Sequence, residues 1–424
     1  MQLNLRKPLT VILSAIMVLT TIASLASAAP KETETKDVYR IVALGDSVSV
    51  GYEPGMKTGS IPYGYVDRLY EQALFHGRSE LASYAVMGLT APGLSTLLKG
   101  AADAKKLTSA DLLGETTLPA EVLQQADSIG AKTPELAADL AQANLVVLTI
   151  GGNDFSPIIK AIKDLTGDTA KQTIENNFNI TMNNYAESMD KVIKGLHLLA
   201  PNAQIVLADQ YLPLWEPLPY YSELSNAVIT LANRLDTLAE DLNKQDIPLK
   251  IAHVSPKFVK NEKKFTHFNV VEEFDTHPSQ AGYESIAQTF AEVIWKQYLK
   301  PAPRASGVPI SIIINGKEPP NKPTMINNTT FLALTDVADA VGAEVKWTQK
   351  TKTAVFSKNG RVVSITVGAK TITINGVSQP ISTPAYFQTV GKNLKTYVPL
   401  AVISSGLDYQ VVYRKNLLAA FINS

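Results

Sequence analysis

The sequence predicts an α/β fold for residues 38–300, a flavodoxin-like three-layer sandwich around a parallel five-stranded sheet. Short runs rich in valine and isoleucine alternate there with longer amphipathic segments. Such alternation places parallel strands side by side, with the connecting helices on both faces of the sheet. After residue 309 strand-like patterns dominate instead, and this change predicts a separate α+β repeat domain over residues 310–424.

Each expected element has its own pattern. The expected strands are 38–44, 81–86, 145–150, 204–208 and 249–254. The expected helices are 63–76, 175–199, 222–244 and 279–296. In the third helix, leucine and valine recur at three- and four-residue spacing from Leu224 to Leu238, which is typical of a helix with one buried face. Ligands in such a fold bind at the carboxyl ends of the strands.

Two insertions have a helical composition. Residues 101–140 are rich in alanine and leucine, with expected breaks at Gly114 and Pro119, and a second insertion spans residues 155–175. Both could form a wall or lid over a site, or could be surface helices packed on the edge of the sheet. The sequence leaves both alternatives open.

The N-terminus has the pattern of a secretory signal peptide. Arg6 and Lys7 precede an apolar stretch at 11–25, and Ala26-Ser27-Ala28 has the small residues of a cleavage site. We therefore expect a signal peptide at 1–28 and a flexible lead-in at 29–37. The apolar stretch is shorter than the ~20 residues of a membrane-spanning helix, so no stable transmembrane anchor is expected. These features predict a protein that is secreted or associated with the cell surface.

Composition excludes several classes of function. The 424 residues include 39 basic and 39 acidic side chains, which argues against a nucleic-acid-binding protein. There is no cysteine, which rules out disulfides, thiolate metal sites and a cysteine nucleophile. The sequence has no histidine cluster, phosphate-binding glycine loop or dinucleotide fingerprint, so no metal or cofactor is expected.

The C-terminal part contains an internal repeat after a proline-rich linker at 301–309. Ile314-Asn315-Gly316 recurs as Ile374-Asn375-Gly376, and residues 330–334 recur in similar form at 396–400. Each copy continues into a short helical stretch and then a strand, which predicts two copies of one small α+β unit. Residues 310–424 resemble the domain related to the N-terminal domain of copper amine oxidases, which is common on secreted proteins of Gram-positive bacteria. Because histidine and cysteine are lacking there, a copper site is not expected.

Four short motifs occur in an order that suits acyl transfer. They are Gly45-Asp46-Ser47, Gly88, Gly151-Gly152-Asn153-Asp154 and Asp275-Thr276-His277-Pro278. Ser47 follows the first strand through a tight turn, which would lift its hydroxyl above the carboxyl edge of the sheet. A serine hydroxyl is a weak nucleophile and needs a base within hydrogen-bond reach. The alternative is that Ser47 caps a helix, since Asp-Ser is a common helix start.

His277 is the candidate base among five histidines. It precedes an expected helix, with Pro278 at the helix start. His253 ends a strand and is the main competitor by position. His197 lies among leucines and is expected to be packed, whereas His76 and His267 are expected at the surface.

The four motifs together resemble those of the SGNH (GDSL) hydrolases, a family of serine esterases and lipases, over about residues 38–300. The resemblance implies that Ser47 is the nucleophile and His277 the base. It also implies an oxyanion hole formed by the Ser47 backbone N–H, Gly88 and the side-chain amide of Asn153, with Gly93 as an alternative to Gly88.

The third member of the triad departs from the family pattern. The family places an aspartate three residues before the histidine, a position occupied here by Phe274, while Asp275 lies two residues before it. Asp275 is the expected partner of His277, with Glu272 and Glu273 as alternatives. Some family members use a backbone carbonyl instead.

These observations predict a secreted serine esterase or lipase that hydrolyses carboxylic esters through an acyl-enzyme on Ser47. Leu89, Phe155, Ile158 and Ile159 favour a lipid-like acyl chain, although such residues could equally belong to the core. One alternative is a carbohydrate or cell-wall O-acetyl esterase. Another is a non-catalytic protein whose residues 310–424 bind the cell wall or envelope. If the protein is an enzyme, residues 310–424 could still attach it to the cell wall or envelope.

Overall fold

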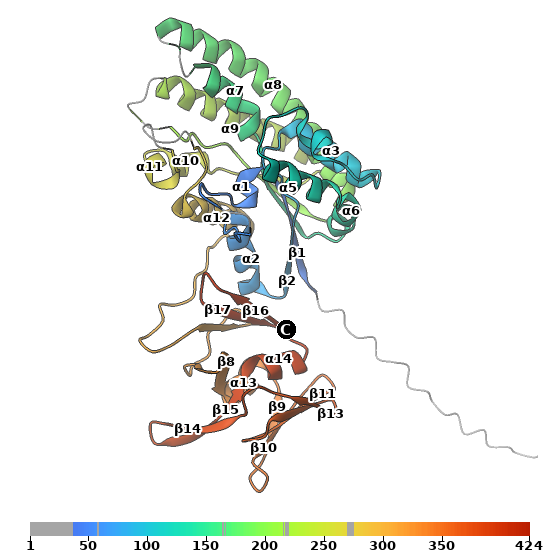
Figure 1. Ribbon diagram of the computed structural model, residues 1–424, viewed down its shortest axis with the longest axis vertical. Helices are drawn as coiled ribbons and strands as arrows, with labels where there is room; N and C mark the ends of the chain where they lie inside the picture. The colour runs from blue at the N-terminus through green and yellow to red at the C-terminus, as the bar shows by residue number, and fades with distance from the viewer. Residues whose placement is uncertain are drawn as a thin grey trace, which may run out of the picture. The chain divides into compact units, whose positions relative to one another are not determined.

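The computed structural model describes residues 37–56, 59–162, 165, 167–214, 216, 220–268 and 275–424 (Figure 1). The expected signal peptide at 1–28 lies outside the described residues, as does all of the expected lead-in except Asp37. None of the described helices is both long enough and apolar enough to cross a membrane.

A parallel five-stranded sheet forms the centre of the first domain, in the strand order β2-β1-β3-β4-β5. Its strands are β1 (Tyr39–Gly45), β2 (Ser79–Ser83), β3 (Leu145–Thr149), β4 (Gln204–Ala208) and β5 (Leu249–Ala252). The five residues of β3 are all buried, because helices cover both faces of a parallel sheet. Each expected strand overlaps an observed one, and β4 has the expected bounds.

Successive residues of each strand contribute to two different cores. Val42, Leu44 and Val146 pack on one face of the sheet. The helices on that face are α3 (Ala91–Ala102), α6 (Thr133–Ala141), α8 (Gly167–Leu199) and α9 (Tyr221–Asn243). Ile41 and Ala43 pack on the other face against α2 (Tyr65–His76) and α12 (Gln280–Trp295). The predicted three-layer sandwich is thereby confirmed.

Both insertions fold into helices that pack on the rest of the domain. In the first, α4 (Ser109–Leu113) ends at Gly114 and α5 (Ala120–Gly130) begins after Pro119, as expected. Ala126 of α5 and Leu136 of α6 are fully buried in the core, so these helices are packed surface helices. The second insertion contains α7 (Gly152–Ile162), which packs on α8. Helix α8 begins eight residues before its expected start, because Ala170 and Ile174 extend its buried face.

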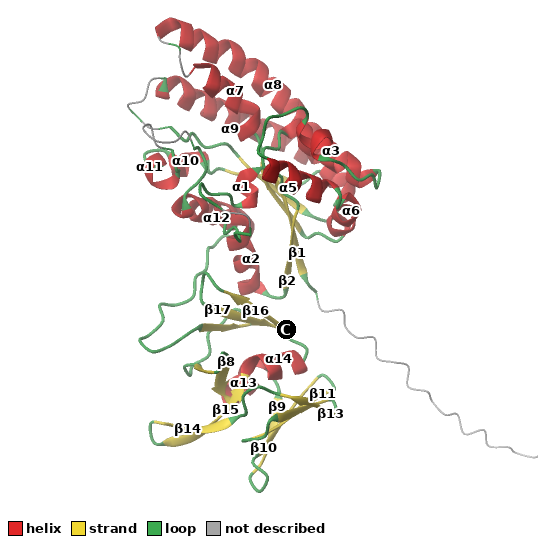
Figure 2. Ribbon diagram, viewed as in Figure 1, coloured by secondary structure: helices red, strands yellow, loops and turns green. Residues whose placement is uncertain are grey.

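The C-terminal domain is mostly β-structure with two short helices, as the sequence predicts (Figure 2). Its strands are β6 (Ser311–Ile314), β7 (Thr324–Ile326), β8 (Thr329–Ala333), β9 (Glu344–Thr348), β10 (Thr353–Lys358), β11 (Arg361–Thr366), β12 (Thr371–Ile374), β13 (Val377–Pro380), β14 (Tyr386–Val390), β15 (Asn393–Pro399), β16 (Gln410–Arg414) and β17 (Ala419–Asn423). Strand β8 leads into α13 (Leu334–Val341), and β15 leads into α14 (Leu400–Gly406). The corresponding strands β8 and β15 pair antiparallel, so the two repeats meet directly.

The repeated Asn-Gly pairs form the same turn in both copies. Asn315 and Gly316 have φ values of +48° and +78°, and Asn375 and Gly376 have +50° and +83°. Two successive left-handed residues define a type I′ turn, which asparagine and glycine adopt at low cost. The recurring tripeptide therefore marks a recurring turn.

The C-terminal sheet β16-β17-β6 contacts helix α2. The Phe421 ring meets the Phe75 ring edge-on at 4.9 Å. The Arg414 guanidinium bonds to Glu71 at 3.0 Å and to Asp67 at 3.1 Å.

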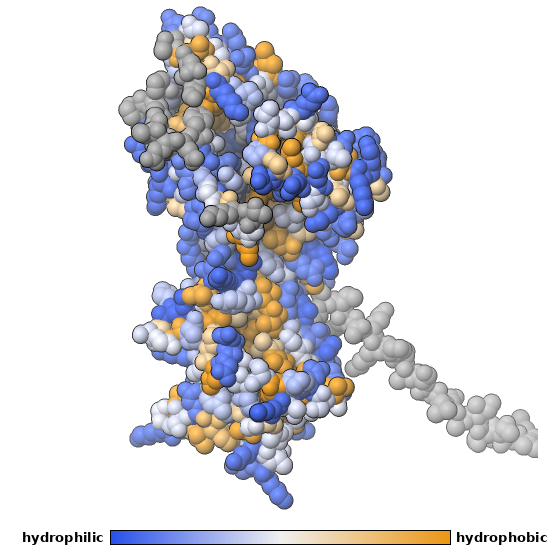
Figure 3. All heavy atoms as spheres, viewed as in Figure 1, coloured by the Kyte–Doolittle hydropathy of each residue, from blue (hydrophilic) through white to orange (hydrophobic). Residues whose placement is uncertain are grey.

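Hydrophobic and hydrophilic residues are interspersed over the face drawn in Figure 3.

Candidate active site

Ser47 is the first residue of α1 (Ser47–Val50), directly after β1. Gly45 ends the strand at φ +119°, and a Cβ there would lie 2.1 Å from the Thr149 carbonyl oxygen, so only glycine fits. Asp46 caps the helix, with its Oδ1 accepting from the Val48 N–H at 3.0 Å. The capping role that the sequence left open for Ser47 therefore belongs to Asp46, and the Ser47 hydroxyl is available for another partner.

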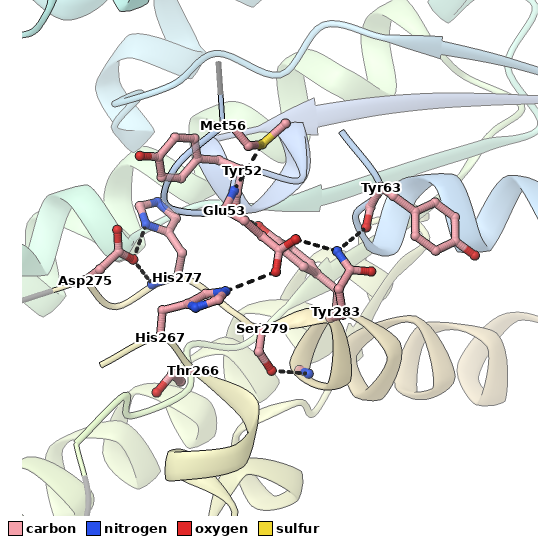
Figure 4. Close-up of polar contacts among 12 residues, drawn as sticks. Tyr52, Glu53, Met56, Tyr63, Thr266, His267, Asp275, His277, Ser279 and Tyr283 are labelled. Atoms are coloured by element: carbon pink, nitrogen blue, oxygen red, sulfur yellow. Dashed lines mark hydrogen bonds and ion pairs between the residues drawn. The ribbon is translucent and has the colours of Figure 1, made fainter. Parts of the chain in front are cut away.

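That partner is His277. Ser47 Oγ lies 2.7 Å from His277 Nε2, although 230 residues separate them in the chain. His277 Nδ1 lies 2.8 Å from Asp275 Oδ1. Figure 4 draws this contact as a dashed line between the two side chains. The structure thus brings Ser47, His277 and Asp275 together as a hydrogen-bonded series. The alternatives Glu272 and Glu273 lie outside the described residues, as does Phe274.

Contacts on both sides hold the loop that carries His277. The Tyr211 hydroxyl donates to the Thr276 carbonyl at 2.9 Å, and the His267 N–H donates to the His277 carbonyl at 2.9 Å. Helix α12 begins at Gln280, with Ser279 as its cap. Pro278 therefore lies directly before the cap rather than at the first helical position, and it pairs with Thr266 in an isolated β-bridge.

The expected oxyanion donors lie in three segments, two of which contact each other. Asn153 is in the first turn of α7, and its Nδ2 donates to the Leu89 carbonyl at 2.9 Å, which uses one of its two amide hydrogens. Gly88 precedes Leu89 in a turn, with φ +79°. Gly93, the alternative donor, directs its N–H to Thr90 Oγ1 as part of the α3 cap. The Ser47 N–H lies at a helix start, where it has no intrahelical acceptor.

A nucleophile, a base with its carboxylate and a nearby amide donor are the parts that serine hydrolysis requires. Comparison with known families adds an independent finding: residues 41–290, more than half of the chain, match the model of the GDSL-like lipase/acylhydrolase family. The chain belongs to the GDSL-like lipase/acylhydrolase family. It is a carboxylic ester hydrolase. Residues 313–420 match the copper amine oxidase N-terminal domain.

Solved structures similar to this GDSL-like hydrolase include three lipolytic enzymes. A lipase from a goat rumen metagenome is 17% identical, with 61% of this chain and 98% of that chain covered and a TM-score of 0.40. The extracellular lipase of Streptomyces rimosus is 16% identical (61% and 99% covered, TM-score 0.41). Phospholipase A1 of Streptomyces albidoflavus NA297 is 16% identical (61% and 98% covered, TM-score 0.39). No curated protein matches the chain.

The other histidines of the hydrolase have different surroundings. Both ring nitrogens of His253, the positional competitor, lie against carboxylates, at 3.1 Å from Asp209 and 3.2 Å from Asp236. His197 has a buried Nδ1 in α8, as its leucine-rich surroundings predict. His76 is exposed and stacks on Trp295. His267 was expected at the surface, but it is partly buried and bonds to Glu53.

Burial and hydrogen bonds shift the pKa values of three aspartates near Ser47 and His277. Burial raises the pKa of Asp46 to about 7, although the Val48 N–H acts in the opposite direction. Burial also raises the pKa of Asp154 to about 6, against the hydrogen bond from the Ala91 N–H. In Asp275, burial acts to raise the pKa, but the hydrogen bonds and charge of His277 outweigh it and the pKa falls below its usual value.

An apolar cavity of about 320 Å³ opens beside Ser47, Asn153 and His277. Its apolar lining consists largely of Phe155, Ile158, Ile159, Phe178, Leu212, Leu224, Val228 and Leu231. Three of the four apolar residues expected near the site line it, whereas Leu89 is fully buried in the core. The wall from α9 could not be recognised in the sequence, because its leucines follow the same periodicity as core residues.

No group of three or more histidine, aspartate or glutamate side chains suited to holding a metal ion occurs within the part of the chain that the structure describes.

Proposed function

We propose that this hydrolase cleaves lipid-like carboxylic esters through an acyl-enzyme on Ser47. Ser47 Oγ attacks the ester carbonyl carbon while its proton passes to His277 Nε2. The tetrahedral oxyanion accepts hydrogen bonds from the Ser47 N–H, the Gly88 N–H and the Asn153 amide. Its collapse breaks the ester bond, and the departing alkoxide takes the proton from His277. Water then attacks the acyl-serine with His277 as base and releases the acid.

The separation of 2.7 Å between Ser47 Oγ and His277 Nε2 is the observation that carries this proposal. It is within the range that direct proton transfer requires. The role of Asp275 is to hold the imidazole with Nδ1 protonated, which leaves Nε2 free to accept the serine proton, and to stabilise the imidazolium that forms.

The cavity supports an acyl chain as the group bound beside Ser47. Its lining is mainly aliphatic and aromatic, and burial of each methylene stabilises a complex by about 0.8 kcal/mol. An acetyl group would leave most of this surface uncovered. We therefore expect esters of longer acids to react with higher kcat/KM than acetate esters.

Two measurements test the proposal. The mature enzyme and its Ser47→Ala variant are compared on p-nitrophenyl esters of acetic, butyric and octanoic acid, and both are treated with a fluorophosphonate probe. We expect labelling of Ser47 and a preference for the longer esters. A preference for acetate would favour the O-acetyl esterase alternative. Absence of labelling in folded protein would favour the non-catalytic alternative.

We further propose that the protein is exported and that residues 310–424 bind an envelope polymer. The signal-like pattern at 1–28 and the match to a copper amine oxidase N-terminal domain support this. Residues 310–424 also carry twelve basic and five acidic side chains in a chain of zero net charge. Purified full-length protein should co-sediment with isolated cell wall and be released by salt, and the exported form should begin at Ala29. Lack of co-sedimentation at low salt would contradict the attachment.

A further inference from the structure

A polar pair outside the triad joins the loop after the nucleophile to the segment beside the base. Glu53 follows α1, six residues after Ser47, and His267 lies ten residues before His277. His267 Nε2 is 3.0 Å from Glu53 Oε1, and Figure 4 shows the two side chains pointing toward each other. Both side chains are largely shielded, with exposures of 25% for Glu53 and 34% for His267.

The backbone of His267 contacts the base directly. Its N–H donates to the His277 carbonyl at 2.9 Å. The neighbouring residues continue this pairing, since Thr266 bridges to Pro278 and the Ser279 N–H donates to the Phe265 carbonyl. A displacement of His267 would therefore be transmitted to the backbone that carries the catalytic imidazole.

Glu53 is itself held in place on the other side. Its second oxygen, Oε2, accepts from Gln280 Nε2 at 2.6 Å, and Gln280 Oε1 in turn accepts from Arg68 at 2.8 Å. Gln280 is the first residue of α12, which follows the His277 loop. The carboxylate of Glu53 thus connects the segment before His277 to the helix after it.

The residue next to Glu53 contacts the base as well. The Tyr52 ring packs edge-on against the His277 ring, with centroids 4.7 Å apart. The Tyr52 carbonyl accepts from the Tyr283 hydroxyl of α12 at 2.6 Å. The loop of Tyr52 and Glu53 therefore supports His277 through a ring contact and through His267.

We propose that Glu53 and His267 are a positioning pair that keeps the His277 imidazole in line with Ser47. This inference rests on the proposed acyl transfer at Ser47. Neither residue belongs to the hydrogen-bonded series of Ser47, His277 and Asp275; both act through the backbone and ring environment of His277. Displacement of a catalytic group by about 1 Å can lower a rate by roughly 100-fold, so a modest shift of the loop has a large effect.

A double-mutant cycle on the full-length enzyme tests the pair. Glu53→Gln and His267→Gln should each lower kcat by about 10- to 100-fold with KM nearly unchanged, because the acyl cavity is untouched. The double variant should be about as active as either single variant, since each substitution removes the same interaction. Glu80→Gln, which removes an exposed pair with Arg40, serves as the matched control and should retain wild-type kcat.

A spectroscopic measurement separates this inference from the proposed function. In protein labelled with ¹⁵N-histidine, the proton shared by His277 Nδ1 and Asp275 should shift or broaden in His267→Gln and remain unchanged in Glu80→Gln. Three outcomes would overturn the positioning role. The losses in kcat from the two substitutions could multiply in the double variant, the substitutions could change KM alone, or the His277 signal could stay unaltered. Failure of the wild-type enzyme to label at Ser47 would instead overturn the proposed acyl transfer.

Discussion

One carboxylate oxygen of Asp275 accepts two hydrogen bonds from His277. Oδ1 lies 2.8 Å from the His277 backbone nitrogen and 2.8 Å from ring Nδ1. An aspartate oxygen that reaches the backbone N–H two residues later forms an Asx turn. This turn explains how an aspartate two residues before the histidine can hold its ring, although the family pattern places it three residues before.

Asp275→Asn should therefore lower kcat by roughly 10³- to 10⁴-fold, because an amide cannot stabilise the imidazolium and favours the wrong tautomer. The initial rate on p-nitrophenyl butyrate measures this effect, with circular dichroism to confirm that the variant is folded. A loss smaller than tenfold would show that another group, such as a backbone carbonyl, orients His277.

Removal of the Asn153 amide should weaken transition-state binding. Asn153→Ala is expected to lower kcat by roughly 10²- to 10³-fold, the usual effect of losing one oxyanion donor, while KM changes little. The fold should be retained, since the side chain makes one hydrogen bond, to Leu89. Steady-state kinetics on a soluble ester provide the measurement. An unchanged kcat would remove Asn153 from the oxyanion hole.

The depth of the cavity should set the preferred acyl length. Ile158 is 5% exposed and lines the cavity on α7. Ile158→Trp places a larger side chain there, so kcat/KM for octanoate should fall relative to that for acetate. The ratio of the two values is measured on wild type and variant, with the exposed Ile229→Trp as control. An unaltered ratio would indicate that the acyl chain binds elsewhere.

Asp46 should make stability depend on pH. Burial raises the pKa of Asp46 from its usual 3.8 to about 7, so between these pH values the folded state keeps a proton that the unfolded state has lost. Stability from this group is therefore full below pH 4 and decreases as the pH rises toward 7. Asp46→Asn cannot ionise, so its free energy of unfolding relative to wild type should increase from pH 5 to pH 8.

Each unit of pKa difference corresponds to about 1.4 kcal/mol, and an increase above about 1 kcal/mol is expected for Asp46→Asn over that interval. Urea denaturation of both proteins at the two pH values gives the comparison. A difference that stays constant with pH would mean that Asp46 is ionised at no cost in the folded protein.

The contact between Arg414 and Glu71 should stabilise the fold. Burial raises the pKa of Glu71 even though Arg414 opposes the shift, and the glutamate side chain is only 3% exposed. Arg414→Met removes the cation that hydrogen-bonds to this carboxylate, which should cost about 3 kcal/mol or more. Arg304→Met, which removes an exposed hydrogen bond to Leu417, is the control.

The double variant Arg414→Met/Glu71→Met should recover much of that loss, because it leaves no unpaired buried charge. The free energy of unfolding in urea distinguishes these cases. A cost below about 1 kcal/mol for Arg414→Met would place the pair among ordinary surface salt bridges.

Local patterns were sufficient for many of the elements, and the resemblance to the SGNH hydrolases singled out the candidate reacting residues. Residues 204–208 form a strand with the predicted bounds, and the breaks at Gly114 and Pro119 fall where expected, since apolar periodicity and helix-ending residues act over a few positions. Ser47, Asn153 and His277 could be selected because each lies in a motif with a recognisable order along the chain.

Other features depended on chain segments meeting across long separations. Glu53 and His267 are 214 residues apart, and Glu71 and Arg414 are 343 apart, so no local pattern relates them. The same holds for the apolar cavity, whose leucines on α9 resemble core residues until folding places them beside Ser47. Short-range order in the chain therefore defines which groups are available for chemistry, and only packing of the whole chain decides which charges pair and which apolar side chains line the cavity beside Ser47.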